Sequence, residues 1–237
     1  MSLVSVTDVT KRFGRHVGVA DVTVELARGE SVVLLGANGA GKTTLIRILA
    51  SLSRPTDGSV TVDGVELTGG DPGVRSRIGV LSHETMLYDD LTARENLRLH
   101  ARLHGVDDEA CERWLDRVGL AERGSDRVRG FSHGMAKRLA LARALLHDPD
   151  VLLLDEPYSG LDQDSLERVE SILAGQGGRT LLASTHDLAR GLALADRLLV
   201  LHRGRLVADV DGTDVEDVDA LAERYRELTG GTDGIAR

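Results

Sequence analysis

The sequence is poor in the residues on which several kinds of structure depend. Its 237 residues include one cysteine, Cys111, and 3% aromatic residues. A single cysteine excludes intrachain disulfides and makes a cysteine-based metal cluster implausible, so we interpret Cys111 as a small residue on a helix. No apolar stretch approaches the roughly 20 residues that cross a bilayer. The start, MSLVSVTDVTKRFG, has neither the charged lead nor the apolar block of a signal peptide. We therefore expect a cytoplasmic protein, for which any membrane role requires a partner.

Positive charge, and lysine above all, is also scarce. The formal net charge is −9, and lysine occurs at Lys11, Lys42 and Lys137 only. An acidic chain argues against general binding of nucleic acid, because affinity for the phosphate backbone comes mainly from a basic surface. A local basic patch remains compatible with this composition. The preference for arginine is typical of a high-GC or salt-adapted source, but it also indicates that Lys42, inside a glycine-rich segment, was selected for its chemistry.

That glycine-rich segment, GANGAGKTT, follows the apolar run at 31–35 and precedes a helical pattern. It has the Walker A spacing G-x-x-x-x-G-K-T, which ends in Lys42 and Thr43. In such a loop, backbone N–H groups and the positive end of the next helix wrap a polyphosphate. We expect Lys42 to contact the terminal phosphates and the Thr43 hydroxyl to bind Mg²⁺. Side chains in place of the loop glycines would block the close approach of the phosphates, and glycine also tolerates a positive φ in such a turn. These glycines are Gly36, Gly39 and Gly41.

A second motif follows the apolar run Val151–Leu154, which ends in the carboxylates of Asp155 and Glu156. Such a run is typical of a parallel strand buried on both faces, and ligands of these sheets bind at the carboxyl ends of the strands. Two adjacent acidic residues at this position can have different roles. Asp155 can hold Mg²⁺, directly or through water, and Glu156 can orient or deprotonate a water molecule. The alternative is a pair of acids that caps the following helix.

Three weaker signals accompany these motifs. His186 follows the apolar run at 180–185, so we expect its ring near the γ-phosphate at another strand end. The short turn of residues 131–135, FSHGM, precedes a helical run and so forms a further anion-binding device. Phe13 could stack on an adenine ring, whereas the alternative is an exposed phenylalanine or one at the edge of the core.

The remaining pattern predicts an α/β chain. Residues 3–9, 19–26 and 58–67 alternate apolar and polar side chains, which predicts a small antiparallel sheet beside the glycine-rich loop. Helical spacing over about 92–123, with a helix start at Asp107-Asp108 between two parts, predicts a helical subdomain inserted into the core. Further helices are expected at 163–174, 188–195 and 215–228, and two strands within 198–209.

Taken together, GANGAGKTT, FSHGM, LLLLDEP, SGLD and STHD have the order and spacing of the ATP-binding subunits of ABC transporters, which the chain resembles over about residues 3–210. The resemblance implies the α/β fold of an ABC-type P-loop NTPase, with a mainly parallel core sheet flanked by helices and an antiparallel β-subdomain. It implies one ATP-binding domain, residues 1–214, with a helical subdomain inserted at about 85–148. A short acidic helix and tail, residues 215–237, would follow.

The resemblance also implies an ATPase that uses ATP and Mg²⁺ and pairs head to tail, most simply as a homodimer. Each ATP would lie between the glycine-rich loop of one subunit and the signature turn of the other. Glu156 would be the catalytic base, His186 the switch histidine, and Asp162 a contact to the other subunit, while Asp155 and Thr43 would bind Mg²⁺. By position, the nucleotide-binding residues are Phe13, Gly36, Asn38, Gly39, Gly41, Lys42, Thr43 and Thr44, and the signature residues are Ser132, His133, Gly134 and Met135.

The chain departs from the family pattern at two places. The signature, usually L-S-G-G-Q, keeps its serine and second glycine here but reads F-S-H-G-M. The glutamine expected after the strand that ends near Ser82 is missing, and His83 or Glu84 stands in its place. Either could approach Mg²⁺ or its water in this coupling loop. A carboxylate would add negative charge, whereas a histidine would add pH sensitivity near neutrality.

Within the family, LSHETMLYDDLT and THDLARGLALADRLLVLHRGRLV look like the haem exporter ATP-binding subunit of cytochrome c maturation. This resemblance implies a subunit that binds a transmembrane permease at the cytoplasmic face of the cell membrane and powers haem export. One alternative is another exporter, of a drug, lipid or polysaccharide. A second is a soluble ABC ATPase that acts as an assembly scaffold, for example in iron–sulfur cluster formation. The absence of a long coiled coil, zinc cysteines and a second copy argues against an ABC protein of DNA repair or translation.

Overall fold

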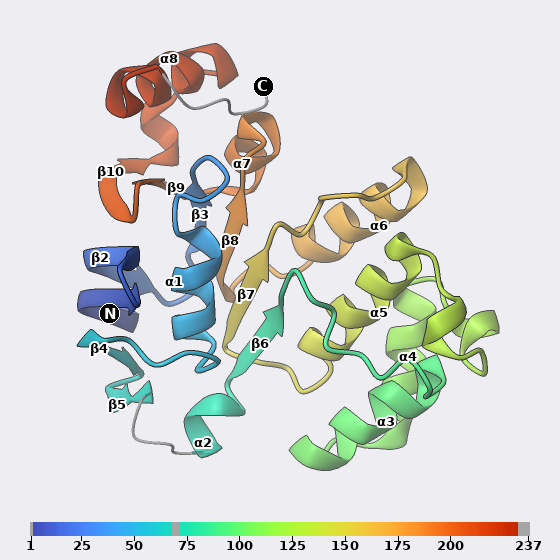
Figure 1. Ribbon diagram of the computed structural model, residues 1–237. Coiled ribbons are helices and arrows are strands. Elements are labelled where there is room, and N and C mark those ends of the chain that lie inside the picture. Colours follow the sequence, from blue (N-terminus) through green and yellow to red (C-terminus); the bar gives the residue numbers. More distant parts are fainter. Residues whose placement is uncertain (1, 68–71, 232–237) are drawn as a thin grey trace.

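Two β-sheets organise the computed structural model, which describes residues 2–67 and 72–231 (Figure 1). The first sheet is antiparallel and has the order β2-β1-β4-β5, which confirms the predicted antiparallel sheet. Strands β1 and β2 are longer than the alternating segments indicated, because their hairpin extends to a turn at Gly14. They are β1 (Ser2–Phe13), β2 (His16–Ala27), β4 (Asp57–Val62) and β5 (Val65–Glu66).

The second sheet is mainly parallel and has the order β10-β9-β3-β8-β7-β6. Every pairing in it is parallel except that of β10 with β9. The register pairs Leu35 of β3 with Thr185 of β8, and Asp155 of β7 with Ser184 of β8, so three strands end side by side. The strands are β3 (Ser31–Leu35), β6 (Ile78–Leu81), β7 (Val151–Asp155), β8 (Thr180–Thr185), β9 (Arg197–His202) and β10 (Arg205–Asp211).

Two hydrophobic clusters cover the two faces of the parallel sheet, which explains why its strands are apolar without alternation. Helix α1 lies in one cluster, between the two sheets, while helices α3 to α8 contribute to the other. The helices are α1 (Lys42–Leu49), α2 (Pro72–Arg75), α3 (Ala93–His104), α4 (Asp108–Arg117), α5 (His133–Leu145), α6 (Gln163–Ala174), α7 (Leu188–Leu194) and α8 (Val218–Thr229). Short 3₁₀ turns occur at Ala121–Arg123, Val128–Gly130 and Gly212–Asp214.

The segment predicted to be helical forms α3 and α4, which pack against each other and against α5. A capping box begins α3, since the Thr92 hydroxyl accepts from the Glu95 N–H and the Glu95 carboxylate accepts from the Thr92 N–H. Cys111 is buried on α4, as expected of a small residue on a helix. Trp114 packs against the core, with the Arg117 guanidinium 4.5 Å from its ring centroid.

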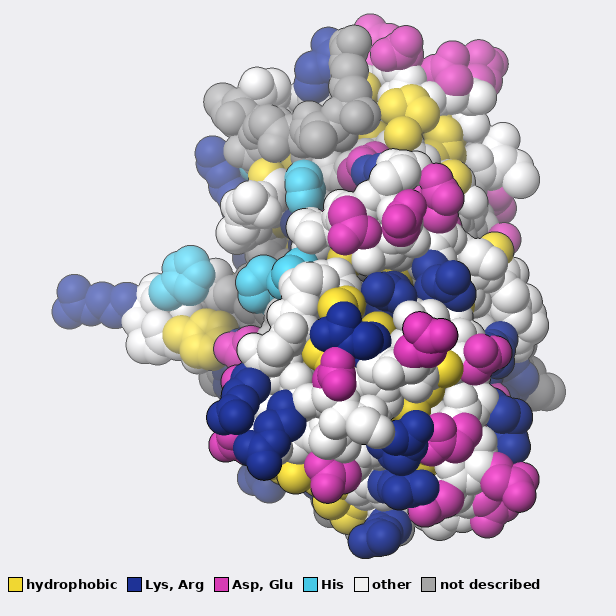
Figure 2. Space-filling view, turned by 90° about the vertical axis from the view of Figure 1, so that its right-hand side faces the viewer, with side chains coloured by type: hydrophobic (Ala, Val, Ile, Leu, Met, Phe, Trp, Pro, Cys, Tyr) yellow, Lys and Arg dark blue, Asp and Glu magenta, His cyan; other side chains and the backbone are white. Residues whose placement is uncertain are grey.

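The C-terminal helix α8 covers most of the predicted segment, and the end of the predicted tail, 232–237, lies outside the described residues. Within the ranges that the structure describes, every helix is too short or too polar to cross a bilayer. Figure 2 shows the face on the right of Figure 1, where Lys and Arg side chains alternate with Asp and Glu side chains.

Candidate active site

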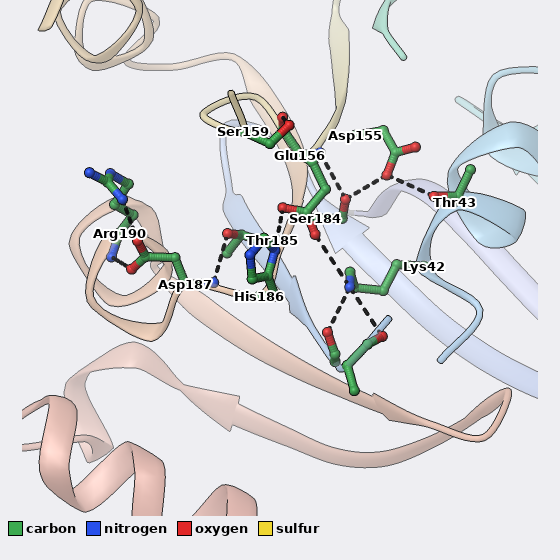
Figure 3. Close-up of polar contacts among 12 residues, drawn as sticks. Lys42, Thr43, Asp155, Glu156, Ser159, Ser184, Thr185, His186, Asp187 and Arg190 are labelled. Atoms are coloured by element: carbon green, nitrogen blue, oxygen red, sulfur yellow. Dashed lines mark hydrogen bonds and ion pairs between the residues drawn. The ribbon is translucent and has the colours of Figure 1, made fainter. Parts of the chain in front are cut away.

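A cavity of about 520 Å³ lies where β3, β7 and β8 end and α1 begins. Figure 3 shows the polar groups that converge there from the start of α1 and from the ends of β7 and β8. Residues from the β1–β2 hairpin and from the loop after β6 complete its wall. The lining residues are His16, Gly18, Ala37, Asn38, Gly39, Gly41, Lys42, Thr43, Thr44, Ile46, Arg47, Leu52, Val80, Ser82, His83, Glu84, Asp155, Glu156, Ser159 and His186.

The structure adds a further reason for the loop glycines. A Cβ at Gly36 would lie 2.6 Å from the carbonyl oxygen of Leu201, and one at Gly41 would lie 2.4 Å from that of Gly18. At these two positions a side chain would collide with the chain's own backbone, whereas the block of the phosphates stays a prediction. Gly39 has open space around its Cβ position, and its requirement is a φ of +83°.

Lys42 reaches back over the loop that precedes it. Its ammonium donates to the carbonyl oxygens of Gly36 at 2.6 Å and Ala37 at 3.3 Å, and lies 3.4 Å from Oε1 of Glu156. The side chain is 6% exposed. A buried cation in contact with carbonyl and carboxylate oxygens can equally bind phosphate oxygens, which are also anionic acceptors.

Asp155 is fully buried and joins three segments of the site. Its Oδ1 accepts hydrogen bonds from the hydroxyls of Thr43, at 3.1 Å, and Ser184, at 2.7 Å. Sequence reasoning missed Ser184, although a hydroxyl that interrupts the apolar run of β8 near its end was a signal. Hydroxyl and carboxylate oxygens that converge in this way suit Mg²⁺, which binds few protein ligands and completes its shell with water and phosphate. Correspondingly, the described residues contain no group of three or more His, Cys, Asp or Glu side chains that could hold a metal alone.

Glu156 has a backbone φ of +50°, which is uncommon for a residue with a side chain. Its N–H donates to the carbonyl and hydroxyl oxygens of Ser184. Its Oε2 lies 2.9 Å from Nδ1 of His186, so the two predicted catalytic residues are in contact. Its Oε1 is buried and accepts no hydrogen bond within the described chain, although the Lys42 ammonium forms an ion pair with it at 3.4 Å. A buried carboxylate oxygen without a hydrogen bond is an acceptor in need of a donor.

The coupling-loop residues His83 and Glu84 both line the cavity. The Ser82 hydroxyl donates to the carbonyl oxygen of Glu84 and so tightens the turn after β6. Both side chains are exposed. The geometry therefore keeps open which of them replaces the missing glutamine.

Phe13 is 52% exposed at the end of the β1–β2 hairpin. A Cβ at Gly18, which lines the cavity, would lie 3.0 Å from the Phe13 ring, and the Lys11 ammonium lies 5.3 Å from the ring centroid. The ring is thus an exposed apolar surface beside the cavity rather than one of its lining residues. This position is compatible with stacking and with the simpler alternative of an exposed phenylalanine.

The signature residues Ser132, His133, Gly134 and Met135 do not line the cavity of their own chain. They have local roles instead. The Ser132 hydroxyl caps α5 by accepting from the Met135 N–H, and a Cβ at Gly134 would lie 2.6 Å from the hydroxyl oxygen of Ser165 on α6.

Asp162 caps α6 in the same way, accepting from the Ser165 N–H at 2.8 Å. This hydrogen bond from the Ser165 backbone lowers the pKa of the exposed Asp162 carboxyl. The signature turn and the SGLD segment therefore lie against each other within one chain.

Comparison with known proteins decides the family. The model of the ABC transporter family matches residues 19–159. The chain belongs to this family. It is 39% identical over 218 residues to the ABC transporter ATP-binding protein NatA of Bacillus subtilis (strain 168), which covers 86% of this chain and 88% of that protein. The Nod factor export ATP-binding protein I of Cupriavidus pinatubonensis is 37% identical, covering 91% and 68%, and the daunorubicin resistance ATP-binding protein DrrA3 of Streptomyces coeruleorubidus is 38% identical, covering 87% and 67%.

Solved structures of ABC proteins share the fold. A structure described as the ATP binding subunit of an ABC transporter has a TM-score of 0.86 and 32% identity, covering 96% of this chain and 99% of that one. The ATP-binding cassette MJ0796, solved as a dimer in a post-hydrolysis state with ADP and Pi, has a TM-score of 0.80 and 25% identity, covering 88% and 98%. The predicted ABC-type α/β fold is confirmed. The chain is an ATP-binding subunit that hydrolyses ATP.

Proposed function

We propose that this chain dimerises when it binds ATP and powers a membrane exporter by hydrolysing it. The observation that carries the proposal is the convergence of Lys42, Asp155 and Glu156 on one cavity at the ends of three parallel strands. The open oxygen of Glu156 and the buried ammonium of Lys42 provide an acceptor for a proton and a contact for phosphate in the same place.

In this proposal, the backbone N–H groups of the loop and of the start of α1 wrap the phosphates, from Asn38 through Thr44. Lys42 exchanges its carbonyl partners for oxygens of the terminal phosphates. Thr43 and Asp155 would hold Mg²⁺, with His83 or Glu84 near its water, and the bound metal would supply positive charge for the transferred phosphoryl group. Phe13 stacks on the adenine from the end of the β1–β2 hairpin.

Glu156 orients a water molecule with Oε1 and accepts its proton while the water oxygen attacks the γ-phosphorus and the bond to ADP breaks. His186 holds the other carboxylate oxygen at 2.9 Å and so fixes the direction of the acceptor. Because the ring is also partly exposed, it can contact the γ-phosphate from the open side of the cavity.

The signature residues Ser132 to Met135 act across the dimer, on the ATP held by the second subunit, and Asp162 contacts that subunit. Their position away from their own cavity supports this assignment, as does the dimer found for MJ0796. ATP then contacts both subunits, so closure is favoured while the γ-phosphate is present and lost after hydrolysis.

We further propose that residues 1–214 act as one ATP-binding domain with the helical subdomain at about 85–148 inserted, and that 215–237 form an appended helix and tail. The partner is a transmembrane permease, which holds the dimer at the cytoplasmic face of the membrane. Nucleic acid is not a partner, because the net charge is −9 and the charges on the face in Figure 2 are mixed rather than basic.

The identity of the cargo is the most specific part of the proposal. The relatives named for export of Nod factor and for resistance to daunorubicin favour an exporter of a drug- or lipid-like compound. Haem export, which the LSHETMLYDDLT stretch suggested, has no support in the names of the relatives described above and stands as the alternative. A soluble scaffold is the remaining alternative.

Glu156→Gln tests the role of the base. The amide keeps the size of the side chain but cannot accept the proton, so we expect MgATP binding to be retained, a dimer to accumulate by light scattering, and hydrolysis to fall by about 10²-fold or more. Asp164→Asn, on the exposed first turn of α6, is the control for loss of an acidic charge and should keep the wild-type rate. Wild-type hydrolysis by Glu156→Gln would contradict the assignment.

The cargo is tested by capture of the partner. Tagged Glu156→Gln chain with MgATP is purified from native membranes in mild detergent, and the bound proteins are identified. A permease of a drug or lipid exporter supports the proposal. A multispanning protein encoded with cytochrome c maturation factors moves the cargo to haem, and soluble partners alone support the scaffold.

A further inference from the structure

Lys137 is a buried lysine that the proposed chemistry does not use. It lies on α5, five residues after Ser132, and is 4% exposed in a chain with three lysines. Its ammonium donates to the carbonyl oxygens of Glu156 at 2.5 Å and of Ser159 at 2.9 Å, and to the hydroxyl oxygen of Ser159 at 2.9 Å. Three donors therefore meet three acceptors, as a buried ammonium requires.

These acceptors belong to the tight turn that follows β7. The Ser159 N–H and hydroxyl both donate to the carbonyl oxygen of Glu156, so the turn closes directly after the carboxylate. Lys137 enters this turn from a different helix. Its side chain therefore fixes the place of the turn relative to α5, not merely its shape.

The backbone of Glu156 is held on both sides. Its N–H is bound by Ser184 of β8 and its carbonyl by Lys137 of α5, while φ stays at +50°. A residue with a side chain keeps such a left-handed conformation only where its surroundings over-determine it. A change at the carbonyl would rotate the Cα–Cβ direction and displace the carboxylate from His186.

Burial lowers the pKa of Lys137 to about 8, while the nearby carboxylates of Glu156 and Asp155 act in the opposite direction. A lysine retained at such a site, in a chain that otherwise uses arginine, indicates that the compact ammonium group fits three acceptors that a planar guanidinium would not satisfy in the same way.

We propose that Lys137 is a positioning residue, which holds the Glu156 carboxylate in its productive direction by tying the turn after β7 to the signature helix α5. The inference rests on the proposed role of Glu156. It adds a connection between the two ATP sites of the dimer, because α5 begins with the residues that act on the second subunit's ATP and also holds the base of its own site.

The test compares Lys137→Met with Lys137→Arg in the purified full-length chain. We expect Lys137→Met to lower kcat by about 10- to 100-fold, since misplacement of a catalytic group by about 1 Å has that effect. The Kd for MgATP should change less than about threefold, because the phosphate contacts are intact. Lys137→Arg keeps the charge and hydrogen-bond donors and should recover part of the lost rate.

Arg138→Met is the matched control. It removes a cation at the next position of the same helix, whose guanidinium donates to the carbonyl oxygen of Val118 rather than to the site. Its kcat should stay near that of the wild type. Thermal unfolding of all variants separates positioning from folding, because a merely structural lysine would lower Tm, kcat and ATP affinity together.

Wild-type kcat in Lys137→Met, or a loss of kcat that parallels losses of ATP affinity and Tm, would overturn the inference. If Lys137→Met does not fold, Lys137→Gln and Lys137→Arg carry the same comparison, and a wild-type kcat in both would overturn it. The Glu156→Gln variant separates failure of this inference from failure of the proposed function. An inactive Glu156→Gln together with a fully active Lys137→Met removes this inference alone, whereas an active Glu156→Gln removes the proposed function as well.

Discussion

Gly39 and Gly41 lie two residues apart in the glycine-rich loop and make different demands on the backbone. Both have positive φ, but a Cβ at Gly39 meets open space and one at Gly41 meets the Gly18 carbonyl. We expect Gly39→Ala to lower the free energy of unfolding by about 1–2 kcal/mol, the cost of a left-handed residue with a side chain. Gly41→Ala should cost about 2–6 kcal/mol, since a backbone collision adds to the strain. Urea unfolding checks both values, and equal stability of the two variants would contradict the argument.

At this scale the sequence predicted the positive φ of the glycine-rich loop but not the backbone atoms that forbid a side chain there. The Walker A spacing singled out Gly36 and Gly41, but the atoms that forbid a side chain belong to Leu201 and Gly18. Those partners are distant along the chain, so no local pattern could name them. The hydroxyl of Ser184 in the run of β8 was a signal that was missed, but its partner Asp155 lies 29 residues away and could not be named from it.

Among the elements, α8 has a direct contact with the glycine-rich loop. The hydroxyl of the buried Tyr225 accepts a hydrogen bond from the Ala37 N–H at 3.1 Å, across 188 residues of sequence. We expect Tyr225→Phe to cost about 1 kcal/mol of stability, the net value of one hydrogen bond. ATP affinity should also fall a few-fold, because the loop loses one of its fixed points.

Thr229→Val is the control for this prediction. It removes another buried hydroxyl of α8, which donates to a carbonyl within the helix and not to the loop. Isothermal titration with MgATP should show wild-type affinity for Thr229→Val. Equal affinities for the wild type and Tyr225→Phe would mean that α8 supports the core alone.

The junction of α3, α5 and β6 should make the fold sensitive to acid. The rings of His104 and His147 stack with centroids 4.0 Å apart, and His147 lies beside the carbonyl of Ile78. Burial, with the neighbouring cation of Arg143, lowers the pKa of His100 and of His147 to about 4. His104 and Arg179 act in the same direction on His147.

The sign of the effect follows from proton binding. A histidine of the unfolded chain titrates near 6.5, so between about pH 6.5 and pH 4 the unfolded state binds protons that the folded state does not. Stability is therefore fully present above pH 6.5 and is lost as the pH falls toward 4. We expect Tm to fall as the pH is lowered through this window. The slope of Tm against pH should be smaller in His147→Gln. His16→Gln, at an exposed hairpin position, should leave the slope unchanged, and a wild-type slope in His147→Gln would refute the account.

The order of the helices and strands could be predicted from the sequence, because each element depends on residues that are close together along the chain. Helix α6 and strand β8 have the predicted bounds, 163–174 and 180–185, since an N-cap aspartate and a mainly apolar run mark them locally. The segment predicted as helical over 92–123 contains two helices, and the second starts at Asp108, as the Asp107-Asp108 pair indicated. A left-handed Gly105 ends the first of them. The contacts of Lys137 and Tyr225 depend on how the helices pack against other elements, which the hydrophobic periodicity of the sequence does not predict.

In the whole molecule, the parallel sheet explains why a shared site could be predicted from the sequence. It does not determine the contacts to a second subunit. Strand ends that carry Asp155 and His186 must meet at one edge once the strands are parallel, so a shared site was predictable from three separate motifs. Contacts across a dimer depend on a second chain. The roles of Ser132, Gly134 and Asp162 toward a second subunit are therefore proposals, whereas their capping and packing contacts are features of this chain.

Helix α1, packed between the two sheets, has a consequence for the dynamics of the whole molecule. Leu45, Ile46 and Leu49 share one hydrophobic cluster with residues of both sheets, so α1 cannot fray without opening that cluster. Amide hydrogens of α1 should consequently exchange with solvent only through global unfolding, as the slowest class in the protein. The phosphate-binding loop is thus attached to the part of the molecule that unfolds last. Bound nucleotide should therefore raise the protection of amide hydrogens against exchange throughout the core, and not only in a local lid.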